Sequence, residues 1–166
     1  ETTVKAAWDA AAIAAATTGK VIATLDPNAP LTQATVTALK DVKATDAITF
    51  ETTDNDLDGT AEINALISLN KILPKPNSKA DWSAINTIEG SANDVSIIKQ
   101  ALAIAKNEDL AVTITGGKIS AEDANAIAKL AGGALTATIK DGSVAATLKA
   151  LANVNASDAL TFESTD

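Results

Sequence analysis

The chain contains no cysteine, histidine, methionine, tyrosine or arginine, and aromatic residues make up only 2% of its 166 residues. Without imidazole or thiolate side chains it can form no histidine-containing triad, no thiol nucleophile and no ordinary zinc or copper site. All 13 basic residues are lysine and the formal net charge is -8, which argues against a nucleic-acid-binding surface. We therefore expect neither an enzyme nor a nucleic-acid partner.

Long hydrophobic runs are also missing. The longest apolar stretch, Ala10 to Ala16, is far shorter than the roughly 20 residues that a membrane-spanning helix requires. Apolar residues nevertheless make up 46% of the chain, and 36 residues are alanine. This composition predicts a folded chain without a membrane span, with a core of small side chains.

The sequence contains internal repeats. The segment Asp46–Asp54 recurs as Asp158–Asp166, and Gly19–Asp26 matches Gly133–Lys140. A diverged third copy fills the middle. We predict repeat unit 1 at 1–54, unit 2 at 55–118 and unit 3 at 119–166. Because the sequence begins and stops within the same Glu-Thr/Ser-Thr motif, we expect a fragment of a longer array.

Each unit divides into two half-units, in which an alanine-rich helical pattern precedes a short alternating strand. Equivalent strand positions recur about every 25 residues, except for an interval of 38 between Phe50 and Ile88. The excess falls at 70–82, where Pro74 and Pro76 predict a surface insertion. The sequence thus predicts six helix-then-strand pairs. The helices are 4–17, 31–40, 91–106, 120–131 and 143–152, with a further helix before Ile88, and the strand positions are Leu25, Phe50, Ile88, Ile114, Ile139 and Phe162.

The strand pattern favours one architecture. Strands joined through helices are parallel, and a sheet buried on both faces needs nearly continuous apolar strands. The segment Leu135–Ile139 instead alternates apolar residues with threonine. We predict an α/β fold, a repetitive β/α solenoid with parallel strands, helices on one face and a Thr-rich exposed sheet face. The outward residues are Thr24, Thr49, Thr113, Thr136, Thr138 and Thr161, interrupted by Ile22, Ala111 and Glu163.

One acidic loop resembles the first half of a calcium-binding loop, since hard cations take several oxygen ligands and a glycine permits the tight turn. The bidentate acid expected at the twelfth position is replaced by Ala65. The alternative is a strand-to-helix loop with Thr60 as N-cap and Glu62 in the first helical turn. Calcium is the one cofactor indicated, and its candidate ligands are Asp54, Asp56, Asp58, Thr60 and Glu62.

Other prominent residues have structural explanations. Trp82 is expected to pack the insertion onto a helix, with stacking on a sugar as the alternative. Asp46, Asp109 and Asp158 precede strands and are expected to satisfy local backbone groups. The pairs Gly116-Gly117 and Gly132-Gly133 are assigned to helix ends, where a left-handed residue is favoured.

Segments such as Asp58–Leu66, Gly133–Ile139 and Asp158–Phe162 resemble the repeats of giant secreted surface proteins of marine bacteria, notably cyanobacteria. The resemblance implies an extracellular or cell-surface location and a role in a surface layer, filament, adhesion or motility structure. It supplies no catalytic residues. The insertion at 70–82 departs from the repeats.

The sequence therefore predicts a structural or adhesive segment whose partners are neighbouring repeats or copies of itself. The alternative is a calcium-dependent module that binds cell-surface carbohydrate or a protein through the Thr-rich face or the 70–82 loop.

Overall fold

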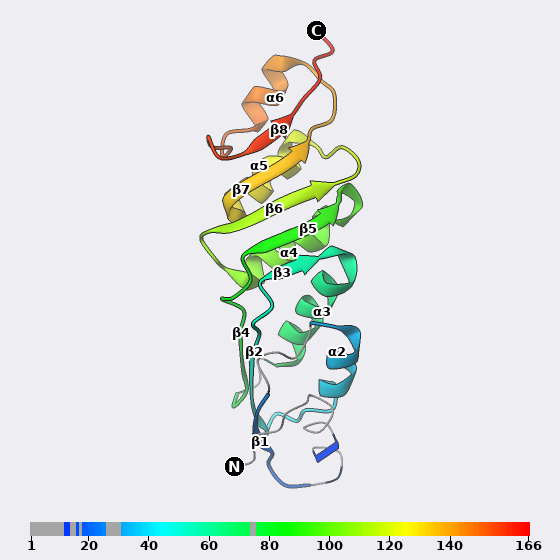
Figure 1. Cartoon of the computed structure of the whole chain (residues 1–166), viewed down its shortest axis with the longest axis vertical. Helices are drawn as coiled ribbons and strands as arrows, with labels where there is room; N and C mark the ends of the chain where they lie inside the picture. The colour runs from blue at the N-terminus through cyan, green and yellow to red at the C-terminus, as the bar shows by residue number, and fades with distance from the viewer. Residues whose placement is uncertain (1–11, 14–15, 17, 26–30, 74–75) are drawn as a thin grey trace.

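Parallel strands follow one another along the molecule in nearly the order of the chain (Figure 1). The computed structural model describes residues 12–13, 16, 18–25, 31–73 and 76–166. The fold is α/β, and all pairings between its described strands are parallel. The strands are β1 (Ile22–Thr24), β2 (Ala47–Glu51), β3 (Asp56–Asp58), β4 (Lys79–Asp81), β5 (Thr87–Ser91), β6 (Leu110–Thr115), β7 (Gly132–Thr138) and β8 (Ala159–Thr161).

The strands form two sheets, in the orders β1-β2-β4 and β3-β5-β6-β7-β8. The chain passes directly from β2 to β3 and, later, from β4 to β5. Because β2 pairs with β4 and β3 pairs with β5, the β2–β3 segment lies beside the β4–β5 segment in both sheets. Between the two pairings, the amides of Asn86 and Thr87 both donate to the carbonyl of Asn55. The two sheets thus adjoin along one pair of extended segments.

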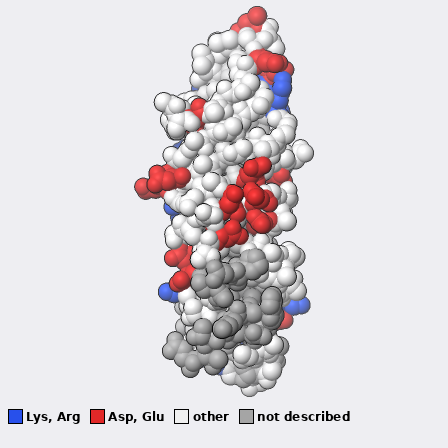
Figure 2. Space-filling view, viewed as in Figure 1, with Lys and Arg blue, Asp and Glu red and all other residues white. Residues whose placement is uncertain are grey.

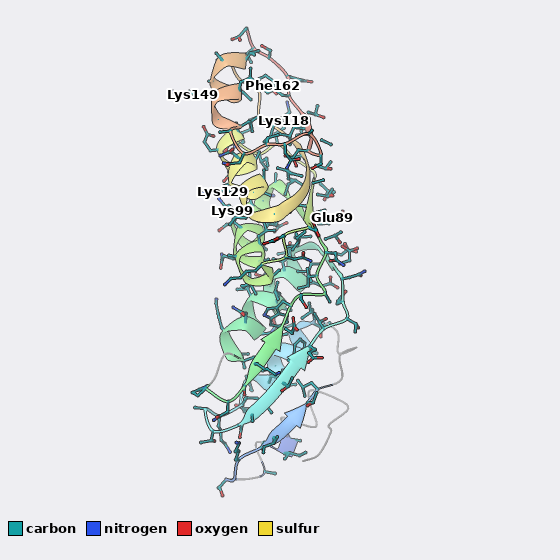
Figure 3. The ribbon with its side chains drawn as sticks, turned by 90° about the vertical axis from the view of Figure 1, so that its left-hand side faces the viewer. Glu89, Lys99, Lys118, Lys129, Lys149 and Phe162 are labelled. Atoms are coloured by element: carbon teal, nitrogen blue, oxygen red, sulfur yellow. The ribbon has the colours of Figure 1, made fainter. Side chains whose placement is uncertain are left out.

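The helices lie on one side of the strands (Figures 1 and 3). Each α-helix from α2 to α6 packs against the next one. No helix among the described residues is long and apolar enough to cross a membrane. The helices are α2 (Gln33–Leu39), α3 (Gly59–Ile72), the 3-10 helix η1 (Ala92–Asp94), α4 (Val95–Ala105), α5 (Ala121–Ala131) and α6 (Val144–Ala150).

Side-chain caps start most of these helices, as the sequence predicts. Ser91 and Asp94 form a complete capping box before α4, with the Asp94 carboxylate accepting from the Ser91 amide at 3.0 Å. Ser120 and Ser143 accept hydrogen bonds from the third residue of α5 and α6, respectively. Each bond satisfies a backbone donor that the first helical turn leaves without a partner. Of the predicted helix 4–17, the described Ala12, Ile13 and Ala16 are helical, and the rest lies outside the described residues.

The core lies between the strands and the helices. Leu135, Ala137 and Ile139 are buried, whereas Thr136 is exposed. The same alternation buries Ala23 and Leu25 in the first sheet. One sheet face is therefore apolar and covered by helices, and the other is polar, as the strand pattern predicts.

The predicted strand register holds in part. Thr24 pairs with Thr49, and the amide of Leu25 donates to the Thr49 carbonyl, which aligns Leu25 with Phe50 as expected. Ile88, in contrast, pairs with Val112 and not with Ile114. The prediction is wrong there by two residues. A shift of two keeps the same side chains on the buried face, so the hydrophobic pattern does not reveal it.

The segment 70–82, predicted as a surface insertion, contains regular structure and several buried side chains. Helix α3 continues to Ile72, Leu73 is fully buried and β4 adds an edge strand to the first sheet. Trp82 is only 6% exposed, and its ring lies 5.3 Å from that of Phe50, between centroids. Pro74 lies outside the described residues. Residues 70–82 thus complete the first sheet and part of its core, because the segment carries apolar side chains among its polar ones and these become buried.

Two glycine pairs behave differently. Gly132 has a φ of +72° immediately after α5, as expected for a helix end. Gly116 and Gly117, both with positive φ, follow β6, so their assignment to a helix end is wrong. They form the turn that leads from the strand towards α5.

We expect Gly132→Ala to destabilise the protein by more than about 3 kcal/mol, because a left-handed backbone and a steric clash coincide there. A Cβ atom at Gly132 would lie 1.9 Å from the carbonyl oxygen of Glu108. Gly59→Ala is the matched control, since Gly59 has a φ of +79° but its added Cβ atom would meet no other atom within 4 Å. It should cost only about 1 kcal/mol. Urea unfolding of both variants measures the difference, and equal losses would contradict the clash.

Candidate functional site

The outward sheet face is the surface on which the sequence places its candidate functional residues. Thr24, Thr136 and Thr161 are exposed, and Thr49, Thr113 and Thr138 are half-buried on the same face. Their facing is confirmed by the burial of Ala23, Leu135 and Ala137 beside them in the chain.

The threonines do not form long rows across the strands. Thr24 pairs with Thr49, Thr113 with Thr136 and Thr138 with Thr161. The Thr24–Thr49 row meets Lys79 on β4, and the Thr113–Thr136 row lies between Glu89 of β5 and Ala159 of β8. The face therefore presents threonine pairs, and Thr–Thr pairs stabilise neighbouring strands whatever else they do.

Acidic side chains occupy the outward face where β3 and β5 lie, and Figure 2 shows them gathered on the visible surface. Asp56, Asp58 and Glu89 form this acidic patch, and all three are exposed. Asp58 and Glu89 are directly paired residues of neighbouring strands. Like charges at such positions repel each other, so the patch destabilises the sheet and attracts counterions.

The predicted calcium ligands lie on both sides of the β3–α3 junction, and their side chains have other partners. The Glu62 carboxylate accepts from the Asp58 amide at 2.8 Å, and the Thr60 hydroxyl donates to Asp94 at 2.9 Å. Asp56 accepts from the Thr87 hydroxyl. Asp54 precedes β3 and is half-buried. Within the described residues, no three carboxylates come close enough together to hold a metal ion.

The alternative to a calcium loop, a strand-to-helix loop with Thr60 as N-cap and Glu62 in the first helical turn, is correct in one respect. Glu62 lies in the first turn of α3, where a negative charge interacts favourably with the helix dipole. The N-cap position is held by Asp58 and not by Thr60, so that part of the alternative is wrong. Thr60 instead ties α3 to the capping box of α4, and hydrogen bonds from Ser91, followed by that from Thr60, lower the pKa of Asp94.

Trp82 packs inward, as the sequence predicts, and is only 6% exposed, which leaves little of its ring for stacking on a sugar. Its indole nitrogen donates to the side-chain oxygen of Asn70 at 3.2 Å. An open hollow of about 460 Å³ lies beside it, lined in part by Lys79, Ile104 and Lys106. Trp8, the other tryptophan, lies outside the described residues.

Asp46 and Asp158 connect one strand to the next, beyond the local role predicted for them. Asp46 is fully buried and accepts from the Lys43 amide at 2.7 Å and from the Val21 amide at 3.0 Å. Asp158 accepts from the Asn155 amide at 2.8 Å and from the Leu135 amide at 2.7 Å. Asp109 lacks this pair of bonds among the described contacts, where its amide donates to Asn107.

We expect Asp46→Ala to destabilise the protein by about 2–4 kcal/mol, because two backbone amides lose a charged acceptor in a buried position. Asp46→Asn should recover part of that loss, since the amide oxygen still accepts one bond. Asp158→Ala is the matched variant, and it should cost less because Asp158 is half-buried and water can replace its carboxylate. Equal effects of the two alanine substitutions in urea unfolding would contradict this explanation.

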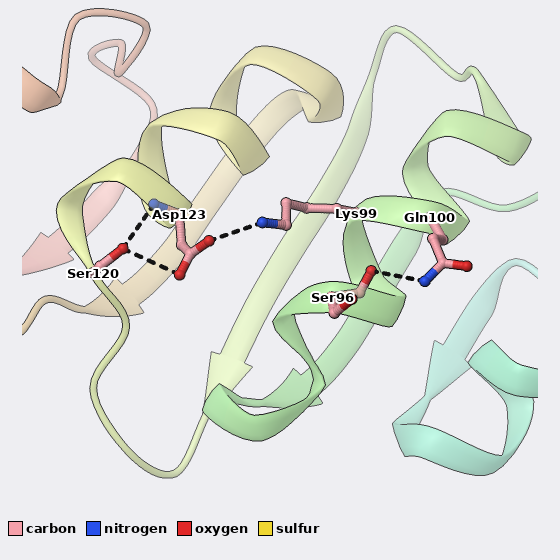
Figure 4. A network of polar contacts seen from close by, with 5 residues as sticks. All are labelled: Ser96, Lys99, Gln100, Ser120 and Asp123. Atoms are coloured by element: carbon pink, nitrogen blue, oxygen red, sulfur yellow. Dashed lines mark hydrogen bonds and ion pairs between the residues drawn. The ribbon is translucent and has the colours of Figure 1, made fainter.

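Ion pairs join successive elements on both sides of the molecule. Lys99 of α4 donates to Asp123 of α5 at 2.8 Å, and Ser120 holds the same carboxylate (Figure 4). On the strand side, Lys118 donates to Asp141 at 2.6 Å and lies 3.6 Å from Glu163. Neither contact is predicted from the sequence. A periodic spacing of about 24 residues between the partners is the only signal of them in the chain.

These contacts shift the pKa values of their groups. The hydrogen bond from Lys99 lowers the pKa of Asp123, against the opposing effect of partial burial. The hydrogen bond with Asp141 raises the pKa of Lys118. Each shift favours the charged form of the group within the folded protein.

We expect Lys99→Met to destabilise the protein by less than about 1 kcal/mol at neutral pH, because both side chains are more than one-third exposed. A lowered carboxyl pKa contributes stability above its unfolded-state value, and this contribution disappears as the pH falls through the folded-state value. The difference in the free energy of unfolding between Lys99→Met and the unsubstituted protein should therefore vanish between about pH 4 and pH 2. Lys129→Met removes the same charge from α5 without breaking any ion pair formed by the described residues. Urea unfolding across this pH range should show a pH-dependent loss for Lys99→Met alone.

Comparison with known proteins returns no match: no family model fits the chain, and no curated protein or solved structure is significantly similar to it.

Proposed function

We propose that the chain is a structural or adhesive repeat segment of a large secreted bacterial surface protein, built as a β/α solenoid from three units. In this proposal, the chain acts through its length, stiffness and repeated surface. Its partners are neighbouring modules or further copies of the chain, and its location is extracellular or at the cell surface.

The observation that carries the proposal is a set of equivalent hydrogen bonds in units 1 and 3. The Val21 amide donates to Asp46, and the Leu135 amide donates to Asp158. On the adjoining strands, the Leu25 amide donates to Thr49 and the Ile139 amide donates to Thr161. The residues involved occupy matching positions of the sequence repeat. Recurrence of the same contacts supports a structural unit that is used more than once.

The arrangement of the helices supports the same proposal. Each helix from α2 to α6 contacts the next, and the strands keep a parallel order beside them. Each added half-unit of one helix and one strand then lengthens the sheet by one strand spacing of about 4.8 Å. It needs no contacts with distant half-units. An array of this kind suits a role that depends on extension.

The calcium-dependent carbohydrate- or protein-binding module remains the alternative proposal, and it has less support. The outward threonines favour it, because hydroxyl groups on a regular face can pair with sugar hydroxyls. The inward packing of Trp82 and the separate engagement of Glu62 and Thr60 count against it. A glycan array probed with and without a chelator distinguishes the two proposals, since the structural segment should bind no glycan under either condition.

Immunogold labelling of the cells that produce the chain tests the main proposal. Antibodies raised against the purified chain should label intact cells along their outer surface. Brief protease treatment of intact cells should remove the label, while a cytoplasmic marker protein in the same cells stays intact. Labelling that appears only after permeabilisation would contradict a surface role.

A further inference from the structure

Strand β4 has an open edge in the interior of the chain. Within the described strands it pairs only with β2, whereas β5, the strand that follows it, pairs with both β3 and β6. The pairing of β5 with β6 begins at Thr87 and Ala111, beyond the end of β4. No described strand therefore occupies the place beside β4 that β6 occupies beside β5.

The backbone of Ala80 points towards this open edge. The Leu25 amide donates to the Thr49 carbonyl, so Thr49 of β2 bonds to the β1 side of the sheet. Successive residues of a strand direct their backbone groups to opposite sides, and Phe50 therefore bonds to β4. Phe50 is paired with Ala80, and in a parallel ladder a residue bonds to the two neighbours of its paired residue. The amide and carbonyl of Ala80 thus point away from β2 and can pair with a further strand.

The hollow beside Trp82 lies at this edge. Its volume of about 460 Å³ falls within the range of about 300–1,000 Å³ that is typical of ligand pockets. Lys79 and Ala80 border it on the β4 side, and Ile104 and Lys106 border it at the end of α4. Because α4 bounds the far side, the hollow has room for one extended segment and not for a second sheet.

The lining of the hollow is positively charged. Lys79 and Lys106 are both exposed and form no ion pair within the described part of the chain, and no described acidic side chain lines the hollow. Asp81 follows closely after Lys79, but its carboxylate accepts from the Ser83 amide at 2.9 Å. The occupant that fits should therefore carry carboxylates and offer backbone groups to the strand edge.

We propose that an extended acidic peptide segment of a partner protein adds to the first sheet beside β4. Its backbone pairs with the amide and carbonyl of Ala80, its apolar side chains contact Ile104, and its carboxylates interact with Lys79 and Lys106. In strand addition, main-chain hydrogen bonds supply affinity and side-chain contacts supply specificity. The site goes beyond the proposed structural role, which requires no peptide ligand.

Fluorescence polarisation tests the charge preference. The probe is a short labelled peptide of alternating glutamate and valine, and a lysine–valine peptide of equal length is its control. Only the acidic peptide should bind. Lys79→Gln and Lys106→Gln should each weaken its binding roughly threefold, whereas Lys129→Gln, at an exposed position of α5, should leave it unchanged. No binding of the acidic peptide at millimolar concentration, or equal effects of the three substitutions, would overturn the proposal.

Amide hydrogen exchange measured by NMR tests the backbone pairing. The Ala80 amide should become protected when the acidic peptide binds, whereas the Asp81 amide, which points towards β2, should be protected in its absence. Ala80→Pro should abolish binding and still fold, because an edge strand tolerates proline where the amide faces away from the sheet. Circular dichroism verifies the folding of this variant.

A peptide methylated at every backbone nitrogen provides a test that leaves the protein unchanged. It keeps the carboxylates but has no amide hydrogen to donate to a strand edge, so its binding should be lost. Equal binding of the methylated and unmethylated peptides would overturn strand addition.

Two other occupants would be revealed by the same purified protein. Displacement of the peptide by an equal or lower concentration of oligogalacturonate would assign the hollow to an acidic sugar. Self-association in sedimentation velocity that Ala80→Pro removes would assign the edge to a second copy of the chain. Either result would overturn the peptide as the partner and leave the surface role, which the labelling of intact cells tests separately, in place.

Discussion

Parallel pairing of short strands is the constraint on which the rest of the structure depends. A strand of three residues such as β1 or β8 forms few hydrogen bonds and buries little surface by itself. It is stable only when neighbouring strands satisfy its backbone groups and a helix covers its apolar face. Asp46 and Asp158 strengthen this dependence, because each carboxylate accepts from an amide of its own turn and from a second amide, that of Val21 just before β1 or that of Leu135 in β7.

The same constraint explains the unusual composition. Small side chains are sufficient when each helix packs closely against one sheet face and its two neighbours, and close packing favours alanine over aromatic residues. The aromatic pair Phe50 and Trp82 lies where the first sheet receives its edge strand β4, next to the junction of the two sheets. Larger side chains thus fill the core where the two sheets adjoin.

Charge on the two sides of the molecule is organised differently. Lys99, Lys129 and Lys149 lie on three successive helices, α4, α5 and α6, on the helix side of the body (Figure 3). The acidic patch of Asp56, Asp58 and Glu89 lies on the sheet side, with Lys118 further along. The ion pairs at Asp123 and Asp141 are exposed, which limits their contribution to stability. Burial of apolar side chains between the helices and the sheets therefore contributes more to the free energy of folding.

The sequence by itself determined the α/β class, the alternation of helices and strands from α4 to β8, and the inward and outward residues of β7. It did so because alternation and helix caps are local patterns that depend on residues within a few positions of one another. Only the tertiary structure decided the pairing of Ile88 with Val112, the inclusion of β4 in a sheet, and the use of Glu62 and Thr60 in capping contacts. These features depend on which segments lie side by side. A two-residue shift in register, or a different neighbour for an edge strand, leaves the local pattern unchanged while it changes the contacts between neighbouring strands.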